Sequence, residues 1–296
     1  MIGMRRVAVS FLLFLICAAQ PYANLVITSD CVVGGYFKAT VSGFTEGNAA
    51  TVELRGAAGD TVSKNVLFIP PGSGDGVKSA VVGVPESLKA GAYTVTVLSE
   101  TGIELESCQI SVQARDFRSE TISLDESMSR LRLTDNKRRV EEAKELFEII
   151  SRKDPEALYH FTPYYTPLDD ARITSYFGDR RLFVYTDSTS DKSVHSGIDL
   201  AAPEGTPVRS AGRGVVVFAG DRLISGYSVV IEHLPGVFSL YYHLSALSVQ
   251  EGDFVAEKEI IGTLGSTGLA TGPHLHWEFR IGGVCVDPDL MTGFSL

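Results

Sequence analysis

Apolar and polar residues alternate over short segments in the first part of the chain, and turn-forming residues separate these segments. Residues 93–97 (YTVTV) alternate cleanly, and similar segments bounded by Gly, Asn, Asp or Pro occur at 36–41, 51–54, 66–69, 77–84 and 108–112. About seven short strands within about 90 residues are typical of an immunoglobulin-like β-sandwich. We therefore predict such a domain at residues 24–113. It gathers no His, Asp or Glu in a ligand or catalytic pattern, which is typical of a spacer or binding module.

A connector with a different composition follows at residues 114–168. An amphipathic helix is predicted from a cap at Thr134 or Asp135 to about Lys153. Its apolar residues recur at three- and four-residue spacing and form one stripe, Val140, Ala143, Phe147 and Ile150. Because a narrow stripe needs a surface to lie on, we expect the helix to pack on the C-terminal domain.

Strand-like patterning returns in the last part of the chain. Apolar-rich segments bounded by turn residues occur at 173–177, 214–219, 227–232, 237–243, 260–264 and 274–281. Tight turns between successive strands, such as the one at 234–236, favour antiparallel pairing. We predict a C-terminal domain at residues 169–296 with a mainly antiparallel β-sheet, so the chain as a whole is expected to be mostly β.

The first 23 residues have the pattern of a secretory signal peptide. Arg5 and Arg6 precede an apolar run at 7–19, which ends in small residues and is too short to span a bilayer comfortably. Cleavage after Ala19 or after Ala23 would release an exported protein. We expect that protein to be periplasmic or associated with the cell wall, without stable insertion in a membrane.

Net charge and cysteine content bear on the possible partners and on disulfide bridging. The 296 residues carry a net charge of −10, which argues against nucleic acid as a partner, because nucleic-acid-binding proteins usually show a basic face. Signal removal would leave Cys31, Cys108 and Cys285 in an oxidising compartment. Cys31 and Cys108 lie at the two ends of the N-terminal domain and are the expected pair if one bridge forms. Three unbridged thiols are the alternative.

Five of the six histidines lie in the C-terminal domain, two of them in the motif His274-Leu-His276. The glycine-rich segment 265–273 leads into a strand at this point, so His274 and His276 project from the same strand face. Two neighbouring imidazoles behind such a loop suit a metal site with an open edge. A pair of hydrogen-bonded surface histidines is the alternative.

A second cluster, His195-Ser-Gly-Ile-Asp199, precedes a segment rich in Gly and Pro. Because Gly197 makes a helix unfavourable, a loop running into a strand must bring His195 and Asp199 together. With His276 they would supply two nitrogens and a carboxylate oxygen, which fits a tetrahedral zinc site whose fourth position is free for water.

The other histidines have weaker patterns. His243 ends another strand, where a core histidine bonded to a carbonyl is the alternative to a functional role. His233 precedes a turn and His160 has no partner at ligand spacing, so both are expected to be structural.

Three separated blocks occur in the order found in a known family: 195–208 (HSGIDLAAPEGTPV), 240–245 (LYYHLS) and 265–276 (GSTGLATGPHLH). Over about residues 173–288 the chain resembles the lysostaphin-type (LytM-type) zinc endopeptidases, which hydrolyse peptide cross-links in bacterial peptidoglycan. The resemblance implies a small, mostly antiparallel sheet with a groove across it for the peptide. The loop at 181–194 does not follow the family pattern closely, and we expect it to form a wall of that groove.

The resemblance also implies a role for five residues. His195, Asp199 and His276 would bind one zinc ion per chain, and His243 and His274 would be the unligated catalytic pair. Zinc is a Lewis acid that activates water near neutral pH, and one imidazole of the pair would take the water proton and deliver it to the leaving amine.

The predicted function is therefore that of an exported zinc metalloendopeptidase acting on peptidoglycan peptides through a zinc-activated water. A non-catalytic wall-binding protein, or an activator of other cell-wall hydrolases, is the alternative, since some family members have lost their ligands. Glu278 is a second candidate for the general base. Two hypotheses concern the rest of the chain: the connector helix covers the groove and restrains the enzyme, and the N-terminal domain binds regulatory proteins.

Overall fold

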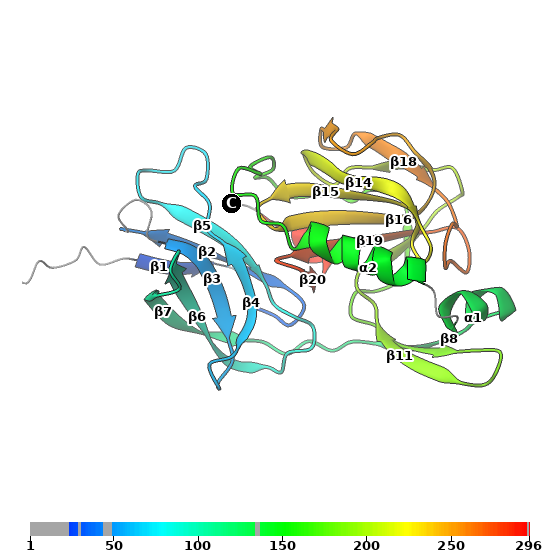
Figure 1. Cartoon of the computed structure of the whole chain (residues 1–296), viewed down its shortest axis with the longest axis horizontal. Helices are drawn as coiled ribbons and strands as arrows, with labels where there is room; N and C mark the ends of the chain where they lie inside the picture. The colour runs from blue at the N-terminus through cyan, green and yellow to red at the C-terminus, as the bar shows by residue number, and fades with distance from the viewer. Residues whose placement is uncertain (1–23, 29–30, 44–48, 134–136, 295) are drawn as a thin grey trace, which may run out of the picture.

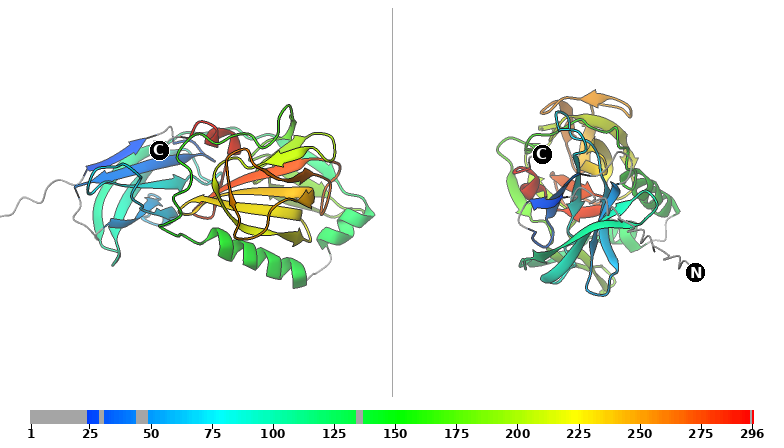
Figure 2. Two further views of the ribbon diagram at one scale, coloured as in Figure 1. Left: turned by 90° about the horizontal axis from the view of Figure 1, so that it is seen from above. Right: turned by 90° about the vertical axis from the view of Figure 1, so that its left-hand side faces the viewer.

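The computed structural model describes residues 24–28, 31–43, 49–133, 137–294 and 296. Two β-rich bodies lie end to end in this part of the chain, and helix α2 (Lys137–Ile150) runs along the larger one (Figure 1, Figure 2). The predicted signal peptide at 1–23 and the predicted helix cap at Thr134 or Asp135 lie outside the described residues. None of the described helices is long and apolar enough to cross a bilayer.

The N-terminal body is a sandwich of two antiparallel sheets, with strand orders β1-β2-β5 and β4-β3-β6-β7. The strand bounds are β1 Asn24–Thr28, β2 Tyr36–Ser42, β3 Ala49–Arg55, β4 Thr61–Val66, β5 Lys78–Gly83, β6 Gly91–Ser99 and β7 Glu104–Val112. Side chains from both sheets fill the interior, and Phe37, Val52 and Val95 are fully buried. In constant-type immunoglobulin domains the fourth strand belongs to the sheet of the first, second and fifth. Here β4 pairs with β3 instead, so the immunoglobulin-like class stays a prediction.

The bridge expected in the N-terminal domain is not formed. No disulfide joins Cys31 to Cys108, and both Cys108 and Cys285 are free cysteines. Burial raises the pKa of the Cys285 thiol to about 11, which keeps this thiol protonated and unreactive at neutral pH. The sandwich is therefore held together by its apolar core rather than by a cross-link.

The C-terminal body is built on a ten-stranded sheet in which every pairing is antiparallel, as predicted. Its main path runs β17-β14-β15-β16-β19-β12-β9, and β13, β18 and β20 join it at the sides. The bounds are β9 Arg172–Ser175, β12 Ile198–Ala201, β13 Pro207–Arg209, β14 Gly214–Arg222, β15 Gly226–Leu234, β16 Val237–Leu247, β17 Phe254–Val255, β18 Ile260–Leu264, β19 Leu275–Ile281 and β20 Val284–Val286, followed by helix α3 at Pro288–Met291. Trp277 and Tyr241 are fully buried on one face of the sheet, whereas Tyr242 and His276 pair across strands on the other.

The connector contributes a strand and a helix that the sequence pattern does not predict. Strand β8 (Ser119–Ser123) pairs in parallel with β10 (Arg180–Val184), which pairs with β11 (Ser190–Val194). Helix α1 (Glu126–Leu133) follows β8 directly. The strands of this separate sheet are short and largely polar, so no regular alternation of apolar residues marks them in the sequence.

Helix α2 lies on the C-terminal sheet, as predicted, but turns a different face inwards. Ile149 and Ile150 are buried against β15 and β16, whereas Val140 and Phe147 of the predicted stripe are 60% and 65% exposed. A tertiary contact sets this rotation, because the Glu142 carboxylate accepts a hydrogen bond from a backbone N–H in the β14–β15 turn. The predicted stripe is therefore wrong at Val140, Ala143 and Phe147, which are exposed, and right at Ile150, which is buried.

The two bodies share one hydrophobic core and are joined by specific polar contacts. Val81 of the sandwich belongs to the same buried cluster as the C-terminal sheet. The Asn65 side-chain amide donates to the backbone carbonyls of Val81 and Pro235, at 2.9 Å each, and Arg115 forms an ion pair with Asp287. The sandwich is thus docked firmly on the C-terminal body, while the predicted domain boundaries stay predictions.

Candidate metal centre

Two adjacent strands and the loop before them bring the predicted ligands together. Asp199 on β12 lies directly opposite His276 on β19, and His195 lies in the loop between β11 and β12. This loop passes so close to β19 that a Cβ on Gly197 would sit 2.2 Å from the Trp277 carbonyl oxygen. Glycine is therefore required there for the backbone to deliver His195 beside the strand pair.

The side-chain donors of these three residues converge on one centre. His195 Nε2 lies 3.1 Å from Asp199 Oδ1 and 2.9 Å from His276 Nδ1. His276 Nδ1 lies 2.7 Å from the same Asp199 oxygen. All three residues are buried. The residues predicted as ligands from two distant parts of the sequence thus surround a common point.

Hydrogen bonds outside the centre fix which ring nitrogen of each histidine faces inwards. His195 Nδ1 lies 2.8 Å from the Tyr176 carbonyl oxygen, which can only accept, so Nδ1 carries the proton and Nε2 presents a lone pair. His276 Nε2 donates to Glu278 at 2.9 Å and leaves Nδ1 facing the centre. Two facing lone pairs and a carboxylate oxygen repel one another unless a cation lies between them. This nitrogen and oxygen donor set fits zinc.

The charges around the centre also favour a cation. Burial raises the pKa of the Asp199 carboxyl, but the close imidazoles of His195 and His276 outweigh burial and hold it well below its usual range. Burial lowers the pKa of His276, but its hydrogen bonds to Asp199 and Glu278 reverse this and raise it to about 9. Both shifts show that positive charge is favoured between these side chains, and a metal ion that binds there would replace a proton.

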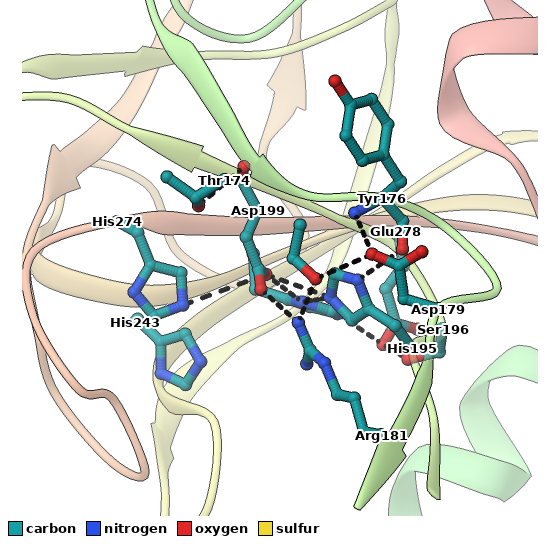
Figure 3. Close-up of polar contacts among 12 residues, drawn as sticks. Thr174, Tyr176, Asp179, Arg181, His195, Ser196, Asp199, His243, His274 and Glu278 are labelled. Carbon is teal, nitrogen blue, oxygen red and sulfur yellow. Dashed lines mark hydrogen bonds and ion pairs between the residues drawn. The ribbon is translucent and has the colours of Figure 1, made fainter. Parts of the chain in front are cut away.

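His243 and His274 lie beside the centre without joining it. Their Nδ1 atoms donate to the carbonyl oxygens of Thr267 and Gly272, at 2.7 and 2.8 Å, so each ring presents Nε2 as an acceptor. The ring centroids are 4.7 Å apart, and His274 Nε2 lies 3.8 Å from Asp199 Oδ1. Figure 3 shows both rings on one side of Asp199. Burial and the neighbouring histidines lower the pKa of His243 to about 3, so this imidazole is neutral.

The backbone at His243 departs from regular strand geometry. Its φ of 61° lies in the left-handed region, which is uncommon for a residue other than glycine. Strict alternation along β16 would put Tyr242 and His243 on opposite faces of the sheet. Both line the same cavity instead, because the strand bulges at this point. The local strain thus delivers the His243 ring to the side of the sheet that holds the metal centre.

Glu278, the second candidate for a general base, is engaged on both oxygens. Oε1 accepts hydrogen bonds from His276 and from the Ser196 hydroxyl, and Oε2 accepts one from Arg280. Burial raises the pKa of the Glu278 carboxyl, but Arg280 and His276 outweigh burial and lower it strongly. Glu278 is therefore placed to orient His276 rather than to take a proton from water.

The two remaining histidines lie away from the centre. His233 Nδ1 donates to the Arg213 carbonyl and its Nε2 pairs with the Ser239 hydroxyl, while His160 Nδ1 accepts from the Arg213 N–H. Neither ring lines the cavity over the metal centre. Both are structural, as their sequence context predicts.

The described geometry agrees with a comparison against protein families. The model of peptidase family M23 matches residues 193–288. Residues 193–288 are a peptidase M23 domain. This range contains the three predicted ligands and the two histidines beside them.

Curated relatives resemble a part of this chain. The chain is 49% identical over 123 residues to the DD-carboxypeptidase/endopeptidase Mpg of Neisseria meningitidis serogroup B, which covers 41% of this chain and 27% of that protein. It is 41% identical over 123 residues to the peptidoglycan DD-endopeptidase ShyC of Vibrio cholerae, covering 42% of this chain and 28% of that protein. The chain thus spans little more than a quarter of the length of these relatives.

One solved structure is similar well beyond the M23 domain. It is the crystal structure of a Pseudomonas aeruginosa protein assigned to peptidase M23, with 26% identity and a TM-score of 0.63. The superposition covers 90% of this chain and 96% of that chain. The shared arrangement therefore includes parts of the sandwich and the connector.

Arg181 is a residue of the site that sequence reasoning did not identify. Its Nη2 lies 2.6 Å from Asp199 Oδ2, the oxygen that faces away from the two ligand histidines. It also contacts the Ser175 hydroxyl at 2.7 Å and Glu120 at 2.5 Å (Figure 3 shows Arg181 and Asp199). Arg181 thus orients the carboxylate so that Oδ1 faces the M23 metal centre. Because the pattern of the segment 181–194 gives no ligand signal, this role follows only from the fold.

The Glu120→Gln variant is expected to bind zinc about tenfold more weakly than the unmodified chain, since loss of an outer-shell partner has effects of this order. Glu120 neutralises Arg181, so its loss leaves an unbalanced positive charge beside the metal centre. Zinc affinity would be measured by competition with a chromophoric chelator. Glu126→Gln is the matched control, because Glu126 forms an exposed ion pair with Arg130 on α1. Equal zinc affinity in both variants would contradict this role of Glu120.

The connector reaches the M23 centre through β8 and α1, not through α2. Glu120, Ile122 and Met128 line the cavity over the centre, whereas none of the residues of α2 does. The hypothesis that the predicted helix covers the groove is therefore wrong in assigning that position to α2. The segment at 181–194 does contribute to the cavity wall, as expected.

Proposed function

We propose that this protein is an exported zinc metalloendopeptidase that hydrolyses peptide cross-links of bacterial peptidoglycan. The observation that carries the proposal is the convergence of two imidazoles and one carboxylate beside two further imidazoles with free Nε2 atoms. The names of the relatives Mpg and ShyC support wall peptides as the substrate class. The signal-peptide pattern at 1–23 supports export to the compartment where such peptides lie.

The residues divide into a metal-holding set and a proton-transferring pair. His195, Asp199 and His276 would hold zinc, which when bound supplies the Lewis acidity that activates water and polarises the scissile carbonyl. The Nε2 atom of His243 or of His274 takes the proton of the attacking water and returns it to the leaving amine. Both rings suit this task because their Nδ1 protons are committed to backbone carbonyls.

Chelation is expected to abolish the release of fragments from purified cell-wall sacculi, and added zinc is expected to restore it. The reason is that an imidazole base alone lacks the Lewis acidity that the cation supplies to the water and to the scissile carbonyl. Fragment release would be followed by absorbance, and mass spectrometry of the released muropeptides would identify the cleaved bond. Activity that persists at full chelation, with zinc content verified as zero, would overturn the metallopeptidase proposal.

A wall-binding protein or hydrolase activator is the second candidate. The intact donor set counts against it, because a non-catalytic protein does not need three ligands and two free imidazoles in one cavity. Digestion of sacculi by this protein alone would be compared with digestion in the presence of a partner amidase. Activity that appears only with the amidase would favour the second candidate.

A further inference from the structure

One wall of the cavity over the metal centre is built by the segment before the M23 domain. The cavity has a volume of about 410 Å³ and extends from the metal centre to a surface formed by β8, α1 and β10. The apolar side chains of that surface are Ile122, Leu124, Met128 and Phe183. Figure 1 shows α1 and β8 beside β11, at the end of the molecule away from the sandwich.

Arg132, near the end of α1, is a charged group that α1 contributes to this wall. Its guanidinium carbon lies 3.8 Å from the centroid of the Phe183 ring, and its Nε donates to the Tyr185 hydroxyl at 2.8 Å. Stacking and this hydrogen bond hold the guanidinium plane in place at the cavity lining. Its Nη2 lies 3.3 Å from each carboxylate oxygen of Asp191, whose side chain is 48% exposed.

The other main charges of the cavity are balanced by close partners inside the protein. Arg181 contacts both Asp199 and Glu120, and Glu278 pairs with the partly buried Arg280. Within the described residues, by contrast, the acidic partner of Arg132 is Asp191, whose side chain is half exposed, and ion pairs with exposed groups are weak. A planar guanidinium fork is also the protein group that best matches a carboxylate. An incoming carboxylate can therefore replace Asp191 at little cost.

We propose that Arg132 binds a carboxylate group of the peptide substrate and so makes the connector a part of the substrate site. This inference rests on the proposed peptidase function and adds to it a substrate class, peptides that carry a free carboxylate near the scissile bond. The neighbouring Ile122, Leu124 and Met128 provide an apolar surface for short aliphatic side chains next to that carboxylate. The carboxylate is either the C-terminus of the peptide or an acidic side chain within it.

Substitution of Asp191 is expected to change peptide binding in the opposite direction to substitution of Arg132. In the free protein it competes with the substrate carboxylate for the same guanidinium. Removing the charge of Arg132 would weaken peptide binding, whereas removing the charge of Asp191 would strengthen it. A purely structural role of this ion pair would instead make both variants worse, since both lose the same contact.

The experiment uses the full mature chain and three synthetic stem peptides: one with all carboxylates free, one with a C-terminal amide, and one with its acidic side chains amidated. Dissociation constants would be measured by calorimetry on chelated protein, and kcat and KM on zinc-loaded protein. Arg132→Gln is expected to weaken binding of the free peptide about tenfold, the order of one charge-assisted hydrogen bond. Asp191→Asn is expected to tighten it. One of the two amidated peptides is expected to bind the wild-type chain and both variants equally. The carboxylate that this peptide lacks is the one that Arg132 binds.

Arg130→Gln is the matched control, because Arg130 lies on the same helix but pairs with Glu126 on its exposed face. It is expected to leave binding of all three peptides unchanged. Equal losses on all three peptides in Arg132→Gln, or weaker binding in Asp191→Asn, would overturn the inference. If the variants give this result while the zinc-loaded wild-type chain cleaves the peptides, only the role of Arg132 is refuted. A zinc-loaded wild-type chain that cleaves none of them refutes the proposed function itself.

Discussion

The His195→Ala variant is expected to lose its zinc and its peptidase activity together. His195 Nε2 contacts both other ligand atoms of the centre, and its removal leaves one nitrogen and one carboxylate oxygen. Two donors do not form the three-ligand set of a catalytic zinc site. Loss of a few kcal/mol of transition-state stabilisation corresponds to a fall in activity on the order of a thousandfold or more. Zinc content would be measured by elemental analysis and activity by release of muropeptides.

The control for this variant must separate loss of metal from loss of fold. His195 is buried and its Nδ1 donates to the Tyr176 carbonyl, so His195→Ala also removes a structural hydrogen bond. His195→Gln keeps an amide donor of similar reach, and circular dichroism would verify that both variants are folded. A folded His195→Ala protein that retains one zinc per chain would show that the ion is held elsewhere.

The His274→Ala variant is expected to keep its zinc but to turn over substrate about a hundredfold to ten-thousandfold more slowly, the range for loss of a positioned proton-transfer group. His274 Nε2 lies 3.8 Å from Asp199 Oδ1, close to the centre but outside the set of ligand atoms. Its ring is exposed enough to the cavity to reach a water and a substrate amine. The measurement is kcat on a defined muropeptide together with zinc content.

His243→Ala is the natural companion of this variant, because the two rings lie side by side with their free Nε2 atoms in the same cavity. The variant with the larger fall in kcat identifies the ring that transfers the proton in the slow step. Unchanged kcat in His274→Ala would remove His274 from the catalytic pair. A loss of zinc in that variant would instead make it a ligand.

The convergence of His195, Asp199 and His276 could be predicted from the sequence because it involves only two strands and the loop before one of them. Asp199 and His276 fall at matching positions of two apolar strands, and the period of a strand decides which face each side chain occupies. His195 follows from the short spacing to Asp199. The antiparallel sheet could be predicted because apolar-rich segments such as 237–243 are joined by tight turns such as the one at 234–236, which favour antiparallel pairing.

The rest of the site depends on contacts between distant segments that leave no periodic signal. Glu120 and Arg181 meet because β8 and β10 pair in parallel, and neither strand shows regular apolar alternation. His243 reaches the cavity through a bulge that a strand pattern does not encode. The rotation of α2 could not be predicted either. The helix itself was predicted, but the contact of Glu142 with the β14–β15 turn and packing on the sheet determine which face is buried.

The core shared between the sandwich and the C-terminal sheet has a mechanical consequence. Val81 packs into that core, and Asn65 ties the sandwich to the turn at Pro235, so the joint has little freedom to bend. If the sandwich is anchored to any surface, the cavity is held at a set height and angle above that anchor. The distance from that anchor to the cavity is then set by the length of the two joined bodies.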